Sequence, residues 1–71
     1  EKLMVHYCVN KNAQTNGDHE VHKVGCRWYP QQENRLSLGD HPSCKPAVVE
    51  AKKTYPKSNG CAHCSPACNT G

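Results

Sequence analysis

The sequence predicts a small α+β domain in which an antiparallel sheet of two to three strands packs against one helix and cysteines staple the chain. Three observations indicate this fold. Strand-like alternation occupies the first half of the chain, one helical stripe follows, and six cysteines are spread over 71 residues. Because a chain this short buries only a limited core, it usually needs covalent or metal links. We therefore expect residues 1–71 to form a single cysteine-rich domain.

The composition limits both the core and the choice of partners. The chain has no Phe and one Trp, and the hydrophobic 35% of its residues includes the cysteines. The net charge of +3 comes from scattered lysines and arginines, a pattern too weak to indicate nucleic-acid binding. No apolar run approaches membrane-spanning length. We expect a monomer that binds a protein partner, and we expect neither nucleic acid nor membrane as a partner.

The first strand is expected over residues 4–9, because Val5, Tyr7 and Val9 would share one face. The polar segment that follows carries an Asn-Gly turn signal and lacks an apolar anchor. We therefore predict a mobile loop at residues 11–18.

Two further strands are expected before the helix. Residues 20–25 would return antiparallel to the first strand and form a hairpin with it. Residues 35–38 predict a short third strand, in which Leu36 and Leu38 share a face. The Gly-Asp pair that follows is expected to end this strand.

One helix is expected from about Ser43 to Tyr55. Ser43 is a good N-cap, because its hydroxyl can accept a hydrogen bond from the first turn. Pro56 ends the helix, since it disfavours helical geometry at the residue before it. A turn at residues 58–60 then delivers the C-terminal cysteines. The apolar stripe has the spacing of a buried helix face and consists of Cys44, Ala47, Val48, Ala51 and Tyr55.

Two pairs of residues predict a zinc site. Zinc prefers four tetrahedral ligands and accepts imidazole together with thiolates. The pairs are His22-x3-Cys26 and Cys61-x2-Cys64, so we predict these four residues as metal ligands. Gly25 could bend the chain and bring the first pair together. In the alternative reading, His22 is a surface strand residue and the cysteines are disulfide partners.

The remaining cysteines are candidates for a staple. Cys44 lies at the start of the expected helix, and Cys68 lies near the end of the chain. A link between them would pin the tail to the helix. Cys8 on the first strand is a third candidate partner, and the sequence cannot choose among the pairings.

Catalytic patterns are weak. The Cys61-Ala62-His63-Cys64 motif resembles the C-x-x-C of thiol–disulfide enzymes, but here the helix precedes the motif, so redox catalysis is a minor alternative. The His-Glu-x-His run at residues 19–22 differs from the helical zinc-hydrolase motif and lies in a strand pattern. No Ser–His–Asp or phosphate-loop pattern stands out. We expect no enzymatic activity and no catalytic residues, with His6, His19 and His41 at the surface.

A set of residues running through nearly the whole chain from Tyr7 carries a resemblance. It comprises Asn12–Gln14, Asn16–His22, Gly25-Cys26, Leu38-Gly39, Cys44, Ala47, Ala51–Lys53, Tyr55, Gly60-Cys61 and Cys64. This set resembles a family of short, uncharacterised bacterial cysteine-rich proteins with no assigned activity. Members often end in Cys-His, where this chain has Cys68-Asn69, and tend to lack a cysteine at the position of Cys8.

A weaker likeness connects the two ligand pairs to small Cys/His metal-binding modules that are appended to bacterial nucleases and repair proteins. It is an analogy at the level of the fold, and such an analogy does not determine function.

The expected function is therefore that of a structural zinc-binding or interaction module. The cytoplasm is the expected compartment, with Met4 as a natural start preceded by vector-derived residues 1–3. The alternative is a disulfide-stapled exported domain, such as a secreted effector or an antimicrobial-type protein, in the periplasm or outside the cell.

Overall fold

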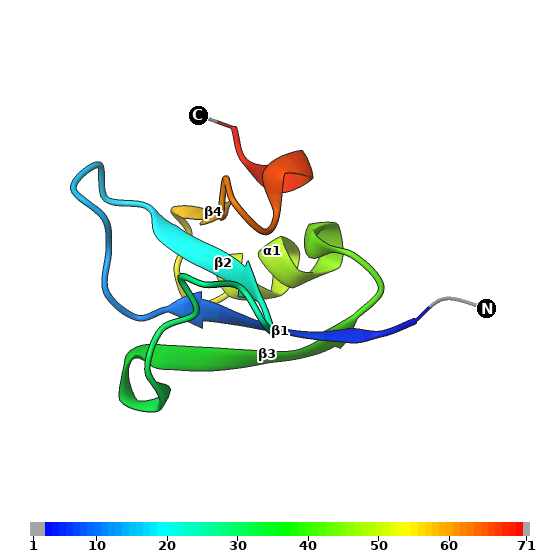
Figure 1. Cartoon of the computed structure of the whole chain (residues 1–71). Helices are drawn as coiled ribbons and strands as arrows, with labels where there is room; N and C mark the ends of the chain where they lie inside the picture. Colours follow the sequence, from blue (N-terminus) through cyan, green and yellow to red (C-terminus); the bar gives the residue numbers. More distant parts are fainter. Residues whose placement is uncertain (1–2, 71) are drawn as a thin grey trace.

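The computed structural model describes residues 3–70, and these form one helix and a four-stranded mixed sheet (Figure 1). The predicted α+β class is confirmed, whereas the predicted sheet of two to three antiparallel strands is wrong. Of the segment 1–3 that was expected to precede the natural start, residues 1–2 lie outside the described part. The strands are β1 (Val5–Asn10), β2 (His19–Lys23), β3 (Arg35–His41) and β4 (Ser58–Gly60), and the helix is α1 (Cys44–Lys52).

The predicted hairpin is present. β1 and β2 pair antiparallel, with Cys8 opposite His22 and Val9 opposite Val21. β3 adds to the free side of β1, and it continues beyond the predicted end through Gly39 to His41. The order of strands in the sheet is therefore β3-β1-β2-β4.

β4 is the strand that the sequence did not reveal. It consists of Ser58, Asn59 and Gly60, which read as a turn because they show no apolar alternation. The strand forms through its backbone, which runs parallel to β2. Main-chain hydrogen bonds frame this pairing, from the N–H of His19 to the oxygen of Lys57 at 2.8 Å and from the N–H of Cys61 to the oxygen of Val21 at 2.9 Å.

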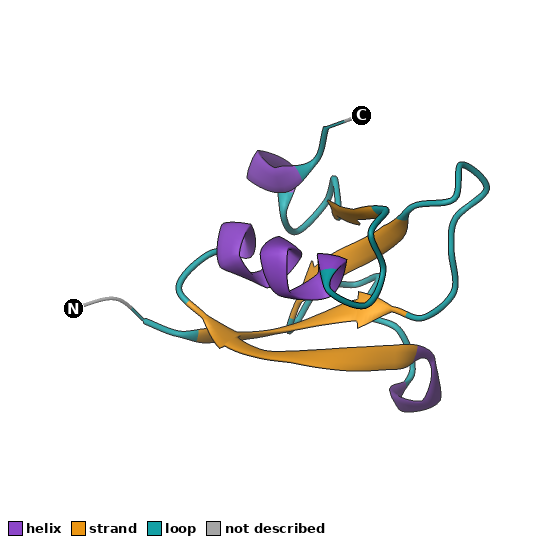
Figure 2. Cartoon of the chain, turned by 180° about the vertical axis from the view of Figure 1, so that it is seen from behind, coloured by secondary structure: helices purple, strands orange, loops and turns teal. Residues whose placement is uncertain are grey.

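Helix α1 covers one face of the sheet (Figure 2). The predicted stripe is confirmed: Cys44, Ala47 and Ala51 are buried, and Val48 and Tyr55 pack against the core as partly buried side chains. The helix ends at Lys52, three residues before the predicted end. The expected capping by Ser43 is wrong in one respect, because its hydroxyl makes no capping hydrogen bond.

The apolar core is small. Its buried members come from both layers and are Tyr7, Val9, Val21, Leu38, Cys44, Ala47 and Ala51. The C-terminal segment lies beside α1 in both Figure 1 and Figure 2, and its apolar residues are alanine, proline and cysteine. A disulfide between Cys44 and Cys68 holds it there, with the two Cα atoms 6.2 Å apart. This is one of the pairings that the sequence left open. No helix in residues 3–70 is long and apolar enough to cross a membrane.

Candidate metal centre

The turn after β2 and the segment after β4 meet in space and bring four candidate metal ligands together. His22, Cys26, Cys61 and Cys64 each offer one ligand atom, and the four atoms lie within 4.8 Å of one another. The Sγ atoms of Cys26 and Cys61 are 4.0 Å apart, and the Sγ atom of Cys64 is 3.9 Å from Nδ1 of His22. The structure therefore brings together all four residues that the sequence singled out as ligands, close enough to hold a metal ion.

Local backbone geometry delivers the first ligand pair. His22 follows the core residue Val21 on β2, so its side chain leaves the opposite face of the sheet. β2 ends at Lys23, and the chain then turns through Gly25 at a φ of +92°, a left-handed conformation that glycine adopts without strain. The N–H of Cys26 closes this turn on the oxygen of Lys23 at 3.1 Å. The turn brings Cys26 back toward His22, as the sequence predicted.

The second ligand pair comes from the segment after β4. Cys61 is buried and follows β4 directly, and its backbone oxygen accepts the N–H of Ser65 at 2.8 Å. This tight turn places Cys64 on the same side as Cys61. The pairing of β4 with β2 thus fixes the distance between the two ligand pairs.

The spacing of the donor atoms suits tetrahedral zinc. With Zn–S bonds of about 2.3 Å, tetrahedral geometry separates two sulfur ligands by about 3.8 Å. The 4.0 Å between the Sγ atoms of Cys26 and Cys61 is close to this value. Three thiolates and one imidazole are also donors that zinc accepts readily.

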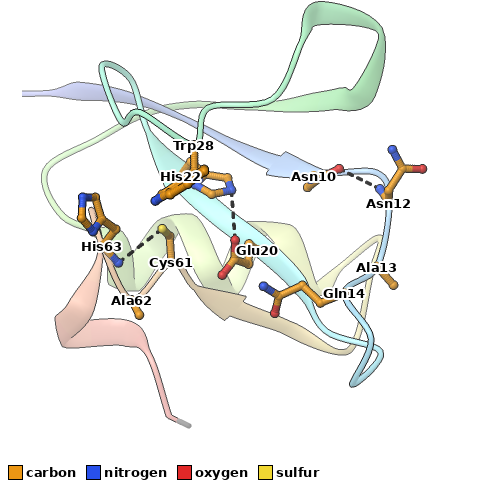
Figure 3. Close-up of a pocket in the computed structure, with 10 residues that line it drawn as sticks. All are labelled: Asn10, Asn12, Ala13, Gln14, Glu20, His22, Trp28, Cys61, Ala62 and His63. Carbon is orange, nitrogen blue, oxygen red and sulfur yellow. Dashed lines mark hydrogen bonds and ion pairs between the residues drawn. The ribbon is translucent and has the colours of Figure 1, made fainter.

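A carboxylate that the sequence did not assign to the site stands behind the histidine. His22 turns Nδ1 toward the sulfurs, while its Nε2 lies 3.5 Å from Oε1 of Glu20 (Figure 3). Metal-binding histidines commonly direct their second nitrogen to a carboxylate, which selects the tautomer and orients the ring. Residues two apart on a strand point to the same face, so the sequence could have placed Glu20 beside His22.

The environment of His22 favours the neutral form of its imidazole ring, which is the form that binds a metal. His22 is 1% exposed, and this burial lowers the pKa of its ring, with the Glu20 carboxylate acting in the opposite direction. Only the neutral ring has a lone pair to give to a metal. Burial therefore favours the protonation state that a ligand needs.

The thiols differ in how readily they ionise. Burial raises the pKa of Cys26 to about 12, with further increases from the nearby Cys64 and Cys61 sulfurs. For Cys64, burial acts in the same direction, but the Lys23 N–H and hydrogen bonds from neighbouring side chains lower the pKa below its usual value. The Lys23 N–H lies 3.3 Å from Sγ of Cys64. Cys64 is therefore easier to ionise than Cys26, and a metal would have to displace the proton from the Cys26 thiol.

A pocket of about 600 Å³ opens beside the ligands (Figure 3). The exposed Trp28 stands on its rim, and the ring of His63 meets the indole edge-on with centroids 6.4 Å apart. Arg27 packs against the same indole at 5.3 Å. Three amide side chains from β1 and the loop after it, together with Glu20, make the rest of the wall polar.

Other histidines and cysteines that the sequence raised lie outside the cluster. His63 is exposed and gives only its backbone N–H to Sγ of Cys61, at 3.4 Å. His19 stacks on Tyr55 with centroids 4.0 Å apart, so the His-Glu-x-His run does not form a metal site. Cys8 is a buried free thiol.

The three histidines expected at the surface, His6, His19 and His41, are partly exposed, and each also makes a hydrogen bond through its ring.

Comparison of the chain with protein-family models, with curated proteins and with solved structures found no match. The resemblance to a bacterial cysteine-rich family stays a prediction, and the site is interpreted from its own geometry.

Proposed function

We propose that this chain is a small structural zinc-binding domain that serves as an interaction module for a protein partner. One observation carries the proposal: a histidine nitrogen and three cysteine sulfurs, from two regions far apart in sequence, lie within 4.8 Å of one another. Donors of this kind and number are those of structural zinc sites.

The completeness of the donor set supports a structural role for the metal. Catalytic zinc sites use three protein ligands and keep a position for water or substrate, whereas structural sites are closed by four. Here all four positions have a protein donor. The Cys61-x2-Cys64 motif also lies in a turn before the three-residue helical turn Pro66–Cys68, unlike the C-x-x-C at the start of a long helix in redox enzymes.

The surface beside the metal supports a protein partner. Trp28 is 58% exposed and Val24 is 50% exposed, and both belong to the turn region that carries Cys26. Exposed tryptophan next to polar groups is typical of residues that dominate protein interfaces. Zinc would hold this turn in one shape and so present Trp28 to a partner. We propose that the chain itself is a monomer that binds neither nucleic acid nor membranes.

The disulfide favours a second candidate, an exported domain. Disulfides persist in oxidising compartments and are rare in the cytosol. The Cys44–Cys68 bond therefore supports the periplasm or the cell exterior over the expected cytoplasm. This candidate concerns where the domain works and is compatible with a zinc site, because the disulfide uses none of the four ligands.

Native mass spectrometry tests the proposal directly. We expect the folded chain to carry one zinc ion and to lose it on acidification, because protons compete with metal for the thiolates. The metal-free mass after denaturation should be lower than that of the fully reduced chain by the two protons lost in one disulfide. A mass lower by six protons, with no metal, would instead show a domain stapled by disulfides alone.

A further inference from the structure

A second cluster lies on β1 and β3 and shares no residue with the metal ligands. Nδ1 of His6 is 2.9 Å from Oδ1 of Asp40, and Nε2 of His6 is 2.9 Å from Oγ of Ser37. Two short hydrogen bonds thus join a hydroxyl, an imidazole and a carboxylate in a row. Hydrolases that form acyl-serine intermediates arrange their nucleophile, base and orienting carboxylate in this order.

An irregularity in the sheet creates this arrangement. Ser37 and Asp40 are three residues apart, and on a regular strand they would point to opposite faces. In the pairing of β1 with β3, Tyr7 lies opposite Gly39. The next residue, Cys8, lies opposite Ser37, so that β3 carries one extra residue at this point. Bulges of this kind re-aim side chains and are frequent next to active sites.

The carboxylate determines which ring nitrogen can act as a base. An ionised carboxylate only accepts hydrogen bonds, so Nδ1 of His6 must carry the ring proton and donate it to Asp40. Nε2 is then the acceptor, and the hydroxyl of Ser37 donates to it. This is the tautomer in which an imidazole can remove the serine proton.

We propose that Ser37, His6 and Asp40 form a nucleophilic serine site that accepts acyl groups from small activated esters. Oγ of Ser37 attacks the ester carbonyl carbon while its proton passes to Nε2 of His6. The bond to the alcohol oxygen breaks, and the alcohol leaves with that proton. Water then attacks the acyl-serine with His6 as the base, releasing the carboxylic acid and restoring the hydroxyl. Asp40 is a positioning residue, since it touches the histidine and not the ester.

The surroundings of the hydroxyl define the class of substrate. The side chains of His6 and Asp40 are 41% and 63% exposed, and Ser37 is exposed as well. The backbone N–H of Gly39 donates a hydrogen bond to Oγ of Ser37 at 3.4 Å, which leaves the hydroxyl proton free to point at Nε2 of His6. A Cβ atom added at Gly39 would meet nothing within 4 Å, so an ester can approach. An open site of this kind favours small esters with good leaving groups, such as p-nitrophenyl acetate.

This activity goes beyond the proposed metal-binding function and does not use the metal. It also departs from the sequence-based expectation that the chain has no enzymatic activity. The Ser–His–Asp set could not be recognised from spacing, because its members come from two strands and depend on the bulge.

Covalent labelling tests the site in the metal-loaded 71-residue chain. A fluorophosphonate probe is added, Oγ of Ser37 displaces fluoride from phosphorus, and tandem mass spectrometry locates the adduct. We expect an adduct at Ser37. Ser43 is the matched control in the same chain, because it is an exposed serine whose hydroxyl makes no capping hydrogen bond. Absence of labelling at Ser37, or equal labelling of Ser37 and Ser43, overturns the proposal.

Variants then test the role of each group, with circular dichroism and zinc content as controls for folding. His6→Gln should slow labelling of Ser37 by about 10²-fold to 10⁴-fold, the usual contribution of a general base. Asp40→Asn should slow it less, and Asp40→Glu should restore part of the rate. A folded His6→Gln variant that is labelled as fast as the parent overturns the proposal. Labelling that is equal in Asp40→Asn and the parent overturns the positioning role of Asp40.

Hydrolysis of p-nitrophenyl acetate provides a second readout. Exposed imidazoles attack this ester directly, so the serine-dependent rate is the difference between the parent and Ser37→Ala. We expect Ser37→Ala to lower the rate and Ser43→Ala to leave it unchanged. Equal rates for the parent and Ser37→Ala would contradict turnover through the serine.

Discussion

Two tethers hold the same C-terminal segment, and they differ in chemistry and in what they hold it to. The Cys44–Cys68 disulfide joins the segment to helix α1 at the edge of the apolar core. The cluster of His22, Cys26, Cys61 and Cys64 joins it to β2 and to the turn after β2. The first tether closes a loop within one half of the chain, whereas the second connects the two halves.

The difference indicates a division of labour. The apolar core already fixes α1 on the sheet, so the disulfide anchors the C-terminal segment to an element that packing holds in place. The turn that carries Cys26 and Trp28 has no comparable packing, since Val24 and Trp28 are exposed. Backbone hydrogen bonds and the ligand cluster, rather than apolar burial, hold its shape. We therefore expect the metal to determine the order of this region and to contribute more to the stability of the domain than the disulfide does.

The largest effect is expected from removing one ligand of the second tether. Cys26→Ser leaves three donors and should abolish zinc binding at neutral pH. A structural zinc site contributes on the order of 10 kcal/mol, comparable with the whole stability of a small domain. We expect loss of cooperative thermal melting, followed by circular dichroism.

Cys8→Ser is the matched control, because Cys8 is a buried cysteine that belongs to neither tether. It should retain zinc and melt cooperatively. Parental melting of Cys26→Ser in the presence of a chelator would show that the cluster does not stabilise the fold.

Removing the disulfide should have a smaller effect. Its cysteines are 24 residues apart, and closing a loop of this length stabilises the folded state by about 3 to 4 kcal/mol. The Cys44→Ala/Cys68→Ala double variant should lose about this free energy of unfolding in urea and still bind one zinc ion. Loss of zinc binding in this variant would contradict the independence of the two tethers.

Gly60 on β4 lies close to the C-terminal segment, and a substitution there tests how tightly the two pack. A Cβ atom added at Gly60 would lie 2.7 Å from Cβ of Cys68 and 2.7 Å from the backbone oxygen of Ser65. Gly60→Ala should therefore push the C-terminal segment away from β4 and lower the free energy of unfolding by about 1 to 3 kcal/mol, the usual effect of overpacking. Urea denaturation measures this loss. Unchanged stability would show that the segment does not pack against β4.

The smallest expected effect concerns the carboxylate behind the metal ligand. Glu20→Gln keeps the size of the side chain and removes the charge that faces Nε2 of His22. Metal affinity should fall by about 10-fold to 100-fold, as for other outer-shell substitutions. Competition with a chromophoric chelator measures the affinity. Glu50→Gln on the exposed side of α1 is the control and should not change it; equal affinities for both variants would remove Glu20 from the site.

The sequence revealed the parts of this molecule that depend on local pattern. The stripe from Cys44 to Tyr55 and the alternation in β1 follow from side-chain periodicity, which is visible within a few residues. The ligand pairs were visible for the same reason, because each pair is close in sequence. The glycine between His22 and Cys26 correctly indicated the turn that brings them together.

What the sequence did not reveal depends on partners distant in the chain. β4 forms through backbone hydrogen bonds to β2, and its Ser-Asn-Gly sequence carries no strand signal. The six cysteines allow many disulfide pairings, and the sequence does not indicate that Cys44 pairs with Cys68. The Ser37–His6 contact requires the bulge between β1 and β3, which moves a side chain from one face of the sheet to the other.

X-ray absorption at the zinc edge tests the central claim most directly, because it reports the ligands of the bound ion. For the purified, zinc-loaded chain we expect about three sulfur neighbours at about 2.3 Å and one nitrogen neighbour at about 2.0 Å. The nitrogen shell should disappear in His22→Ala and persist in His63→Ala, in which the exposed neighbouring histidine is removed. Oxygen and nitrogen neighbours alone, or a first shell unchanged in His22→Ala, would contradict the four-residue site.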